Sequence, residues 1–305
     1  MRRPRSTART VTAVLTSTVL VAACVARAES SPTVRRSPAP AAVALATTAP
    51  VFDDPVAPEV AFDGLDARVK QATSAAADAG AAISVDVMDR NTGQTVSNGN
   101  NTALPIASVA KLFIADDLLL QVAKGQTQLS PSDRHALDVM LQSSDDSAAQ
   151  VFWDRSGGSA IISRVVARYG LTGTTAPYNG HWDLTLSTAS DLVRYYDMLL
   201  DGSGGLPAEQ ANAIVSNLAQ STPTGADGYP QRFGIPDGLY AEPVAVKQGW
   251  FCCWNGGNQL HMSTGAIGSD HRFVMVIGAL QPTSDSVARN TLTQAVKTMF
   301  PAGRI

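Results

Sequence analysis

The chain has 305 residues, of which 45% are hydrophobic, and a formal net charge of −3. Residues 1–23 contain four arginines and no acid, so their removal lowers the charge from −3 to −7. This acidic balance argues against nucleic acid as a partner and against electrostatic adhesion to anionic lipid, because both need a basic patch.

The first 23 residues have the pattern of an export signal. Four arginines precede an apolar run: Arg2, Arg3, Arg5 and Arg9. The run, 11–23, is too short to span a bilayer and has the length of a signal-peptide core.

The apolar run ends in Val21-Ala22-Ala23-Cys24, and small residues before a cysteine are typical of a lipoprotein signal. An ordinary signal peptide followed by a chance cysteine is the alternative. We expect cleavage before Cys24 and acylation of its thiol with palmitate-type chains, which would hold the protein on the outer, extracytoplasmic face of the cell membrane.

Residues 24–58 are rich in Ala, Pro, Ser and Thr and show no hydrophobic period. Such a segment cannot bury enough apolar surface to fold, so it is predicted to be a disordered tether. From residue 59 to 305 the pattern is globular, and we expect one domain there.

The periodicity of apolar residues predicts helices and strands along this domain. Apolar spacing predicts helices over 62–79, 108–123, 130–141, 161–169, 190–200 and 287–299, with a capping box at Ser130 and Asp133. Strands are predicted over 83–88, 245–247, 260–267 and 272–280, with a hairpin after the first and an irregular loop over 221–243. Strands at both ends predict a mixed α/β fold, in which helices flank an antiparallel sheet that carries an inserted all-helical lobe.

Three cysteines and four histidines occur in the chain. Apart from Cys24, the cysteines are the neighbours Cys252 and Cys253, for which a disulfide and two free, partly buried thiols are both open. The histidines show no zinc-site spacing, so no metal or cofactor is expected. They are His135, His181, His261 and His271.

The first motif with chemical potential is Ser108-Val109-Ala110-Lys111, at the start of a predicted helix. The spacing of three places both side chains on one face, with the amine of Lys111 within reach of the hydroxyl of Ser108. The helix start also offers free N–H groups for an oxyanion. Alone the motif is weak, because a capping serine and a solvated lysine give the same pattern.

Two further motifs follow in order. Ser144-Asp145-Asp146 lies between helical stretches, where it fits either a site or a helix cap. Lys247-Gln248-Gly249 ends a predicted strand, where the glycine would let a substrate pair closely with the strand edge.

In this order the three motifs resemble the Ser-x-x-Lys, Ser-Asp-Asn and Lys-Thr-Gly motifs of the serine β-lactamase and penicillin-binding protein superfamily, most closely its class A-like branch. The resemblance covers about 62–300 and implies a β-lactamase or DD-peptidase-like fold. In finer detail the segments 108–113 and 246–250 resemble those of alanine-rich mycobacterial lipoproteins.

The resemblance implies acyl transfer through an ester on serine. Ser108 would be the nucleophile and Lys111 its base. Ser144 would pass a proton to the leaving nitrogen, while Lys247 would hold a substrate carboxylate and polarise Ser144. The backbone N–H groups of Ser108 and Trp250 would form the oxyanion hole.

Asp146, Gln248, Gly249 and Trp250 fall at the substrate-binding positions, but two of them depart from the superfamily. Asp146 replaces an Asn and, when ionised, cannot donate a hydrogen bond. We expect its charge to outweigh partial burial and to keep Lys111 protonated at neutral pH. Gln248 replaces a hydroxyl residue, although its longer amide can still donate to a substrate carboxylate.

A third departure concerns deacylation, for which class A enzymes use a glutamate in the loop after the second motif. No glutamate occurs between Leu171 and Asp191. Asp183, with His181 beside it, is the only acid between those positions, and both are also compatible with an ordinary surface loop. Efficient β-lactam hydrolysis is therefore not expected.

Two functions remain open. One is a serine hydrolase or acyltransferase that acts on peptidoglycan peptides or a related amide or ester. The other is a non-catalytic envelope protein that retains the fold and binds an envelope component. The motifs favour the first, and the departures at Asp146 and Gln248 favour the second.

Overall fold

The computed structural model describes residues 62–305, so the expectations for the signal segment, Cys24 and the tether lie outside the described residues. The domain is built on a five-stranded antiparallel sheet with the order β2-β1-β7-β6-β5. Its strands are β1 (Ala82–Asp89), β2 (Gln94–Ser97), β5 (Val244–Trp254), β6 (Asn258–Ile267) and β7 (Phe273–Gln281). The predicted mixed α/β fold class is confirmed.

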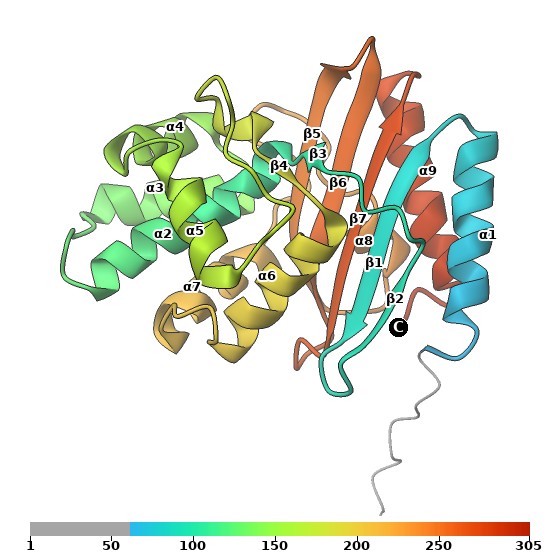
Figure 1. The fold of residues 1–305 in the computed structure, drawn as a ribbon, viewed down its shortest axis with the longest axis horizontal. Coiled ribbons are helices and arrows are strands. Elements are labelled where there is room, and N and C mark those ends of the chain that lie inside the picture. The colour runs from blue at the N-terminus through green and yellow to red at the C-terminus, as the bar shows by residue number, and fades with distance from the viewer. Residues whose placement is uncertain (1–61) are drawn as a thin grey trace, which may run out of the picture. The chain divides into compact units, whose positions relative to one another are not determined.

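Helices cover both faces of the sheet (Figure 1). One face carries α1 (Leu65–Asp78) and α9 (Asp285–Met299), and the other carries α6 (Ala189–Asp201) and the helical lobe. The central strand β7 shows why both faces are buried: Val274 and Val276 belong to the core under the lobe, while Met275 and Ile277 belong to the core under α1 and α9.

The lobe consists of helices inserted between β2 and β5, as the sequence predicts. They are α2 (Lys111–Ala123), α3 (Pro131–Gln142), α4 (Asp146–Arg155), α5 (Ala160–Tyr169) and α7 (Ala208–Ala219). The capping box at the start of α3 is confirmed, because Ser130 Oγ accepts the N–H of Asp133 at 3.1 Å and Asp133 accepts the N–H of Ser130 at 3.0 Å.

Short elements join the lobe to the sheet. They are β3 (Leu104–Pro105), which pairs with β4 (Leu186–Ser187), the 3₁₀ turns η2 (Ala107–Ala110) and η3 (Trp182–Leu184), and the single-turn helix α8 (Ile235–Gly238). Most boundaries lie within three residues of the sequence-based expectation, and two of the differences bear on the site. The α-helix expected from Ser108 begins at Lys111 after the turn η2, and β5 continues seven residues past the predicted end at Lys247.

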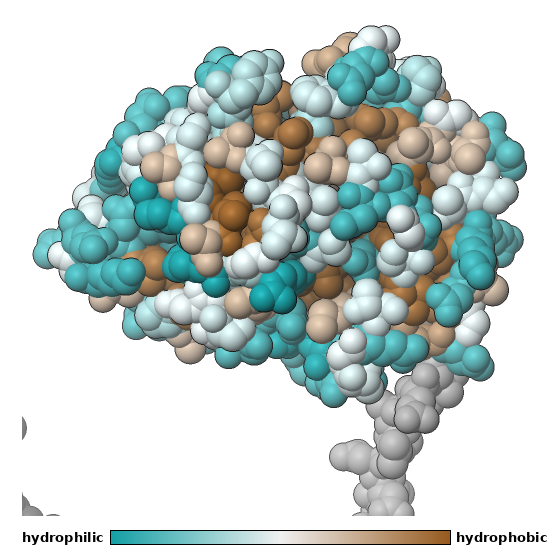
Figure 2. Space-filling model, in the orientation of Figure 1, coloured by the Kyte–Doolittle hydropathy of each residue, from teal (hydrophilic) through white to brown (hydrophobic). Residues whose placement is uncertain are grey.

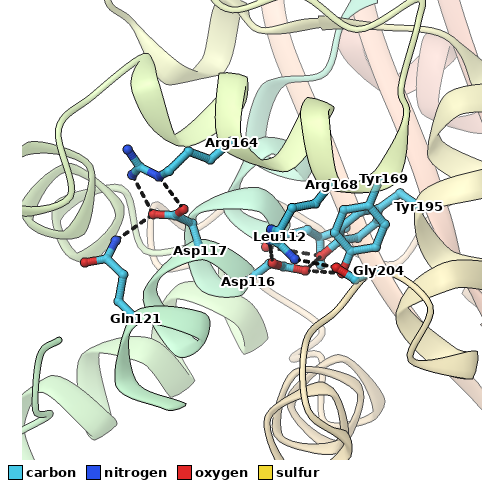
Figure 3. Close-up of polar contacts among 9 residues, drawn as sticks. All are labelled: Leu112, Asp116, Asp117, Gln121, Arg164, Arg168, Tyr169, Tyr195 and Gly204. Atoms are coloured by element: carbon cyan, nitrogen blue, oxygen red, sulfur yellow. Dashed lines mark hydrogen bonds and ion pairs between the residues drawn. The ribbon is translucent and has the colours of Figure 1, made fainter. Parts of the chain in front are cut away.

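Helix α2 is anchored in the lobe by two neighbouring carboxylates (Figure 3). Asp116 is fully buried and accepts hydrogen bonds from Arg168 and from the hydroxyls of Tyr169 and Tyr195. Asp117 accepts two hydrogen bonds from the guanidinium of Arg164, one from Nε and one from Nη2, each 2.7 Å long. These contacts tie α2, which begins at Lys111, to α5 and α6, so that the lysine stands on a rigid element.

Hydrophilic residues dominate the face drawn in Figure 2, and apolar residues show mainly in the recesses between them. Between residues 62 and 305, no helix is both long and apolar enough to cross a bilayer.

Candidate active site

A cavity of about 440 Å³ opens beside the lobe, and its wall combines residues from distant parts of the chain. Ser108 and Asp146 line it, as do residues of η3, of the loop between α7 and α8, and of β5. The lining residues that bear on reactivity and recognition include Ser108, Asp146, Trp182, Asp183, Asp227 and Trp250.

Ser108 stands at the wall because the chain before it turns sharply. Ala107 has a φ of 47°, in the left-handed region that a residue with a Cβ rarely adopts. The preceding Ile106 is held by a hydrogen bond from its N–H to the carbonyl of Thr185 at 2.9 Å. The turn leaves Ser108 7% exposed, with its side chain facing Lys111.

Lys111 is the centre of the polar contacts beneath the cavity. Its Nζ lies 2.8 Å from Ser108 Oγ, 2.7 Å from the carbonyl oxygen of Ser144 and 2.5 Å from Asp146 Oδ1. The ring centroid of Trp182 is 4.7 Å away. The amine of Lys111 thus joins the first motif, 108–111, to the second motif, 144–146.

The charge balance at Lys111 differs from the expectation. The side chain of Lys111 is fully buried, whereas the side chain of Asp146 is 73% exposed. Burial therefore lowers the pKa of the Lys111 amine below its ordinary value, and the attraction of Asp146 opposes this only in part because water screens the exposed carboxylate. The prediction that the carboxylate outweighs burial is wrong.

Ser144 links the first and third motifs. Its φ of 57° is again left-handed, and the preceding Ser143 accepts the N–H of Ala226 at 2.7 Å. Lys247 Nζ donates a hydrogen bond to Ser144 Oγ. Lys247 is 1% exposed, and burial, followed by repulsion from Lys111, holds the pKa of its amine well below the ordinary value.

Gln248 does not face the cavity. Its side-chain amide donates to the carbonyl oxygens of Phe233 at 2.6 Å and Gln231 at 3.1 Å, and the residue is 1% exposed. Side chains alternate along β5, so Gln248 lies on the same side as Val246, which belongs to the core under α1 and α9. The structure therefore does not place this amide where it could bind a substrate carboxylate.

Gly249 lies directly against the turn that carries Ser108. A Cβ at Gly249 would lie 2.6 Å from the carbonyl oxygen of Ile106, which is too close for a real contact. The glycine thus allows the turn that carries Ser108 to pack against β5, and the space over it is filled by the protein itself. Trp250, next along the edge strand, does line the cavity and stacks on Tyr229 with ring centroids 4.5 Å apart.

His181 and Asp183 both line the cavity rather than lying on a remote surface loop. Two important wall residues were missed by the sequence-based reasoning. Trp182 lies between the two singled-out residues, so its position was a usable signal. Asp227 had no signal, because it lies in the irregular loop and only the fold brings it to Ser108.

Cys252 and Cys253 are joined by a disulfide across a cis peptide bond and are both exposed. The alternative of two free, partly buried thiols is not what the structure has. Within residues 62–305, no group of three or more His, Cys, Asp or Glu side chains is arranged to hold a metal ion.

Comparisons with known proteins agree with this architecture. No family model matches the chain. Solved structures that share the fold include a β-lactamase from Chitinophaga pinensis, with a TM-score of 0.63, 15% identity, and coverage of 78% of this chain and all of that one. PBP-A has a TM-score of 0.63 and 17% identity, with coverage of 79% of this chain and 96% of that one.

The sequence relatives are much more similar. "Putative lipoprotein LppW" of Mycobacterium bovis and of Mycobacterium tuberculosis is 57% identical over 298 residues, which cover 94% of this chain and 95% of the relative. The chain therefore belongs to the family of the mycobacterial LppW proteins, and its domain has the fold of the serine β-lactamases and penicillin-binding proteins.

Proposed function

We propose that this protein is an envelope lipoprotein whose domain carries out acyl transfer on Ser108, with peptidoglycan peptides or a related amide or ester as substrate. The observation that carries the proposal is the distance of 2.8 Å between Lys111 Nζ and Ser108 Oγ at the wall of a cavity. A nucleophile in hydrogen-bond contact with a buried amine is the arrangement that activates serine.

The contacts support a balanced sequence of proton transfers. Ser108 Oγ would form a bond to the substrate carbonyl carbon while its proton passes to the neutral amine of Lys111. The bond to the leaving group would then break, and the leaving nitrogen or oxygen would take a proton from Ser144. The proton held by Lys111 would replace it by way of Lys247, which contacts Ser144 Oγ, so that both lysines end neutral. Burial of both lysines favours the neutral amine that the first step requires.

Release of the acyl group would need a water or an amine as the second nucleophile. Asp183 is the acid from the loop after the second motif that lines the cavity, and His181 lies beside it. We propose that Asp183 takes the proton from this second nucleophile.

Backbone strain supports a functional site at the same place. Four non-glycine residues of the described domain have a positive φ, and two of them are Ala107 and Ser144. Such residues cost about 1–3 kcal/mol each and persist where the surrounding structure holds them, often at active sites.

The non-catalytic alternative is favoured by one specific contact. Lys111 Nζ has three acceptors, one of them the carboxylate of Asp146, and this set also suits an ammonium ion that cannot act as a base. In that case the cavity would bind an envelope component without reacting with it.

A fluorophosphonate probe distinguishes the two functions, because it forms a bond to an activated serine as fluoride leaves. Acyl transfer predicts one adduct on the intact protein, its loss in Ser108→Ala, and its retention in Ser147→Ala, which also removes a hydroxyl from the cavity wall. Absence of an adduct on Ser108 would instead support the binding function.

Anchoring is tested separately. We propose that acyl chains on Cys24 hold the protein on the extracytoplasmic face of the cell membrane, as the name of the LppW relatives suggests. The mature protein should partition into a detergent phase, and Cys24→Ala should release it or leave it uncleaved. Partitioning that is unchanged in Cys24→Ala would refute the anchor.

A further inference from the structure

We propose that the cavity over Ser108 takes substrates that carry a positively charged amine near the reacting carbonyl, rather than substrates with a free carboxylate there. This inference rests on the proposed acyl transfer and names the substrate class of the same site. It follows from the charges on the cavity wall, from the position of the two lysines, and from the aromatic side chains beside them.

Three carboxylates converge on the wall from separate elements. Asp146 comes from the start of α4, Asp183 from η3 and Asp227 from the loop between α7 and α8. Among residues 62–305, neither Asp183 nor Asp227 has a Lys, Arg or His nitrogen within 4.0 Å. Only Asp146 is paired, with Lys111, and most of its side chain remains exposed.

Lys111, below the wall, is paired with only one of these carboxylates, Asp146. None of the described residues that line the cavity is a lysine or an arginine, and His181 is the only other ionisable one. Lys111 and Lys247 lie below the surface, where their amines contact Ser108, Ser144 and Asp146. A substrate carboxylate would therefore meet negative charge without reaching a free cation.

Aromatic side chains supply an independent reason to expect a cation. Trp182, Trp250 and Phe251 line the same cavity, and the faces of such rings attract ammonium groups. Trp250 is held by its parallel stacking on Tyr229, at an interplanar angle of 8°. Tyr229 in turn donates a hydrogen bond to Asp285, so the ring stack is fixed to the start of α9.

The expected size of the effect follows from Coulomb's law. A carboxylate about 6 Å from an ammonium group in water-like surroundings changes an equilibrium by about threefold. Two such carboxylates favour a cation over a neutral group by about tenfold and disfavour an anion by the same factor. The cation is therefore preferred to the anion by up to about a hundredfold at low salt, and by at least about tenfold once salt screens the charges.

Three p-nitrophenyl esters of equal length test the proposal. The acyl groups are trimethylammonium-butanoyl, its carbon isostere with tert-butyl in place of trimethylammonium, and the half-ester of glutaric acid. In each case Ser108 Oγ bonds to the carbonyl carbon, p-nitrophenolate leaves, and the serine proton passes through Lys111 to solvent. Acylation is followed by intact-protein mass spectrometry, with Ser108→Ala as the background.

The expected order of acylation rates is cationic, neutral, then anionic, with at least about a tenfold difference between the first and last. Asp227→Asn should reduce this ratio by at least about threefold and keep the oxygen that accepts the N–H of Tyr229. Asp270→Asn is the matched control, since this exposed aspartate accepts the N–H of Arg272 in the same way but lies outside the cavity wall. Equal rates, or a faster anionic ester, would overturn the proposal.

Failure of the proposed function gives a different result. If no ester acylates Ser108, the acyl-transfer function is wrong, and charge preference is then measured by calorimetry with the unreactive methyl amides of the same three acids. Tighter binding of the cationic amide, weakened in Asp227→Asn, would support the charge preference of the cavity. Equal binding of the three amides, tighter binding of the anionic amide, or no binding of the cationic amide would overturn it.

Discussion

Gln248 donates its side-chain amide to the carbonyl oxygen of Phe233 at 2.6 Å and so faces away from the cavity that Ser108 lines. The same amide also bonds to Gln231, whose own side chain donates to the carbonyl of Gln142 at 3.0 Å. Gln142 ends α3, two residues before Ser144. A residue at a substrate-binding position of the superfamily thus supports the backbone near Ser144.

Gln248→Ala should destabilise the domain by about 1–3 kcal/mol, because it removes the side-chain donor of the Gln231 carbonyl and leaves the Phe233 carbonyl with only the longer bond from Ser263. Urea denaturation monitored by tryptophan fluorescence measures the change. Gln94→Ala, at an exposed position of β2, is the control and should change stability by less than about 0.5 kcal/mol. Full stability with altered substrate affinity would mean that Gln248 binds substrate after all.

Asp146→Asn should speed the acylation of Ser108. Asp146 raises the pKa of Lys111 against the effect of burial, so its removal moves the deprotonation of the amine to lower pH. The acylation rate should rise with pH as Lys111 loses its proton, and in the variant this rise should begin at lower pH. At pH 7 the gain should approach roughly tenfold if the midpoint moves by about one pH unit.

The matched control is Asp145→Asn, because Asp145 acts on Lys111 less strongly and an asparagine can still cap α4 by accepting the N–H of Ala148. Its acylation profile should move less than that of Asp146→Asn. An unchanged profile in Asp146→Asn would show that Asp146 does not restrain Ser108.

Asp183→Asn should slow the release of the acyl group by roughly a hundredfold while the formation of the Ser108 ester changes little. The reason is that only the second step requires a proton to be taken from water or an amine at this wall. Single-turnover mass spectrometry separates the two rates. His181→Ala tests the neighbouring side chain, and slower release in this variant but not in Asp183→Asn would assign the base to the histidine.

Asp86 should make the domain more stable in mildly acidic solution. Burial under α6 raises the pKa of its carboxyl from 3.8 to about 6, and its Oδ1 has no hydrogen-bond partner. The folded state therefore binds the proton more tightly than the unfolded state, so stability falls as pH rises from about 4 to above 6.

Asp86→Asn should consequently raise the free energy of unfolding at pH 7 by up to about 3 kcal/mol, and the gain should disappear near pH 4. Urea titrations at several pH values measure this difference. Asp78→Asn, at the exposed end of α1, serves as the control. A gain that is equal at both pH values would exclude titration of Asp86 as its cause.

The Cys252–Cys253 disulfide should influence the cavity more than global folding. Both residues are exposed at the end of β5, and a link between neighbours closes almost no chain, so little entropy is removed from the unfolded state. The Cys252→Ser, Cys253→Ser double variant should unfold within about 1 kcal/mol of the parent but react at a different rate with the esters, since Phe251 lines the cavity. Failure of the variant to fold under non-reducing conditions would make the disulfide structural.

The sequence determined the element types and the three motifs. Helical and alternating periods depend on which residues are apolar, and these patterns persist whatever the elements pack against. The spacing of Ser108 and Lys111 is likewise local, because residues three apart share one face of a turn. These features therefore led to the correct fold class and to the pairing of the serine with the lysine.

The tertiary structure decided the properties that depend on neighbours. The complete burial of Lys111, against the exposure of Asp146, set the direction of the lysine pKa. The residues packed behind β5 turned Gln248 inward, and the path of the loop brought Asp227 to the wall. Desolvation and charge at a site arise from the sum of contacts between segments distant in sequence, and no local pattern encodes that sum.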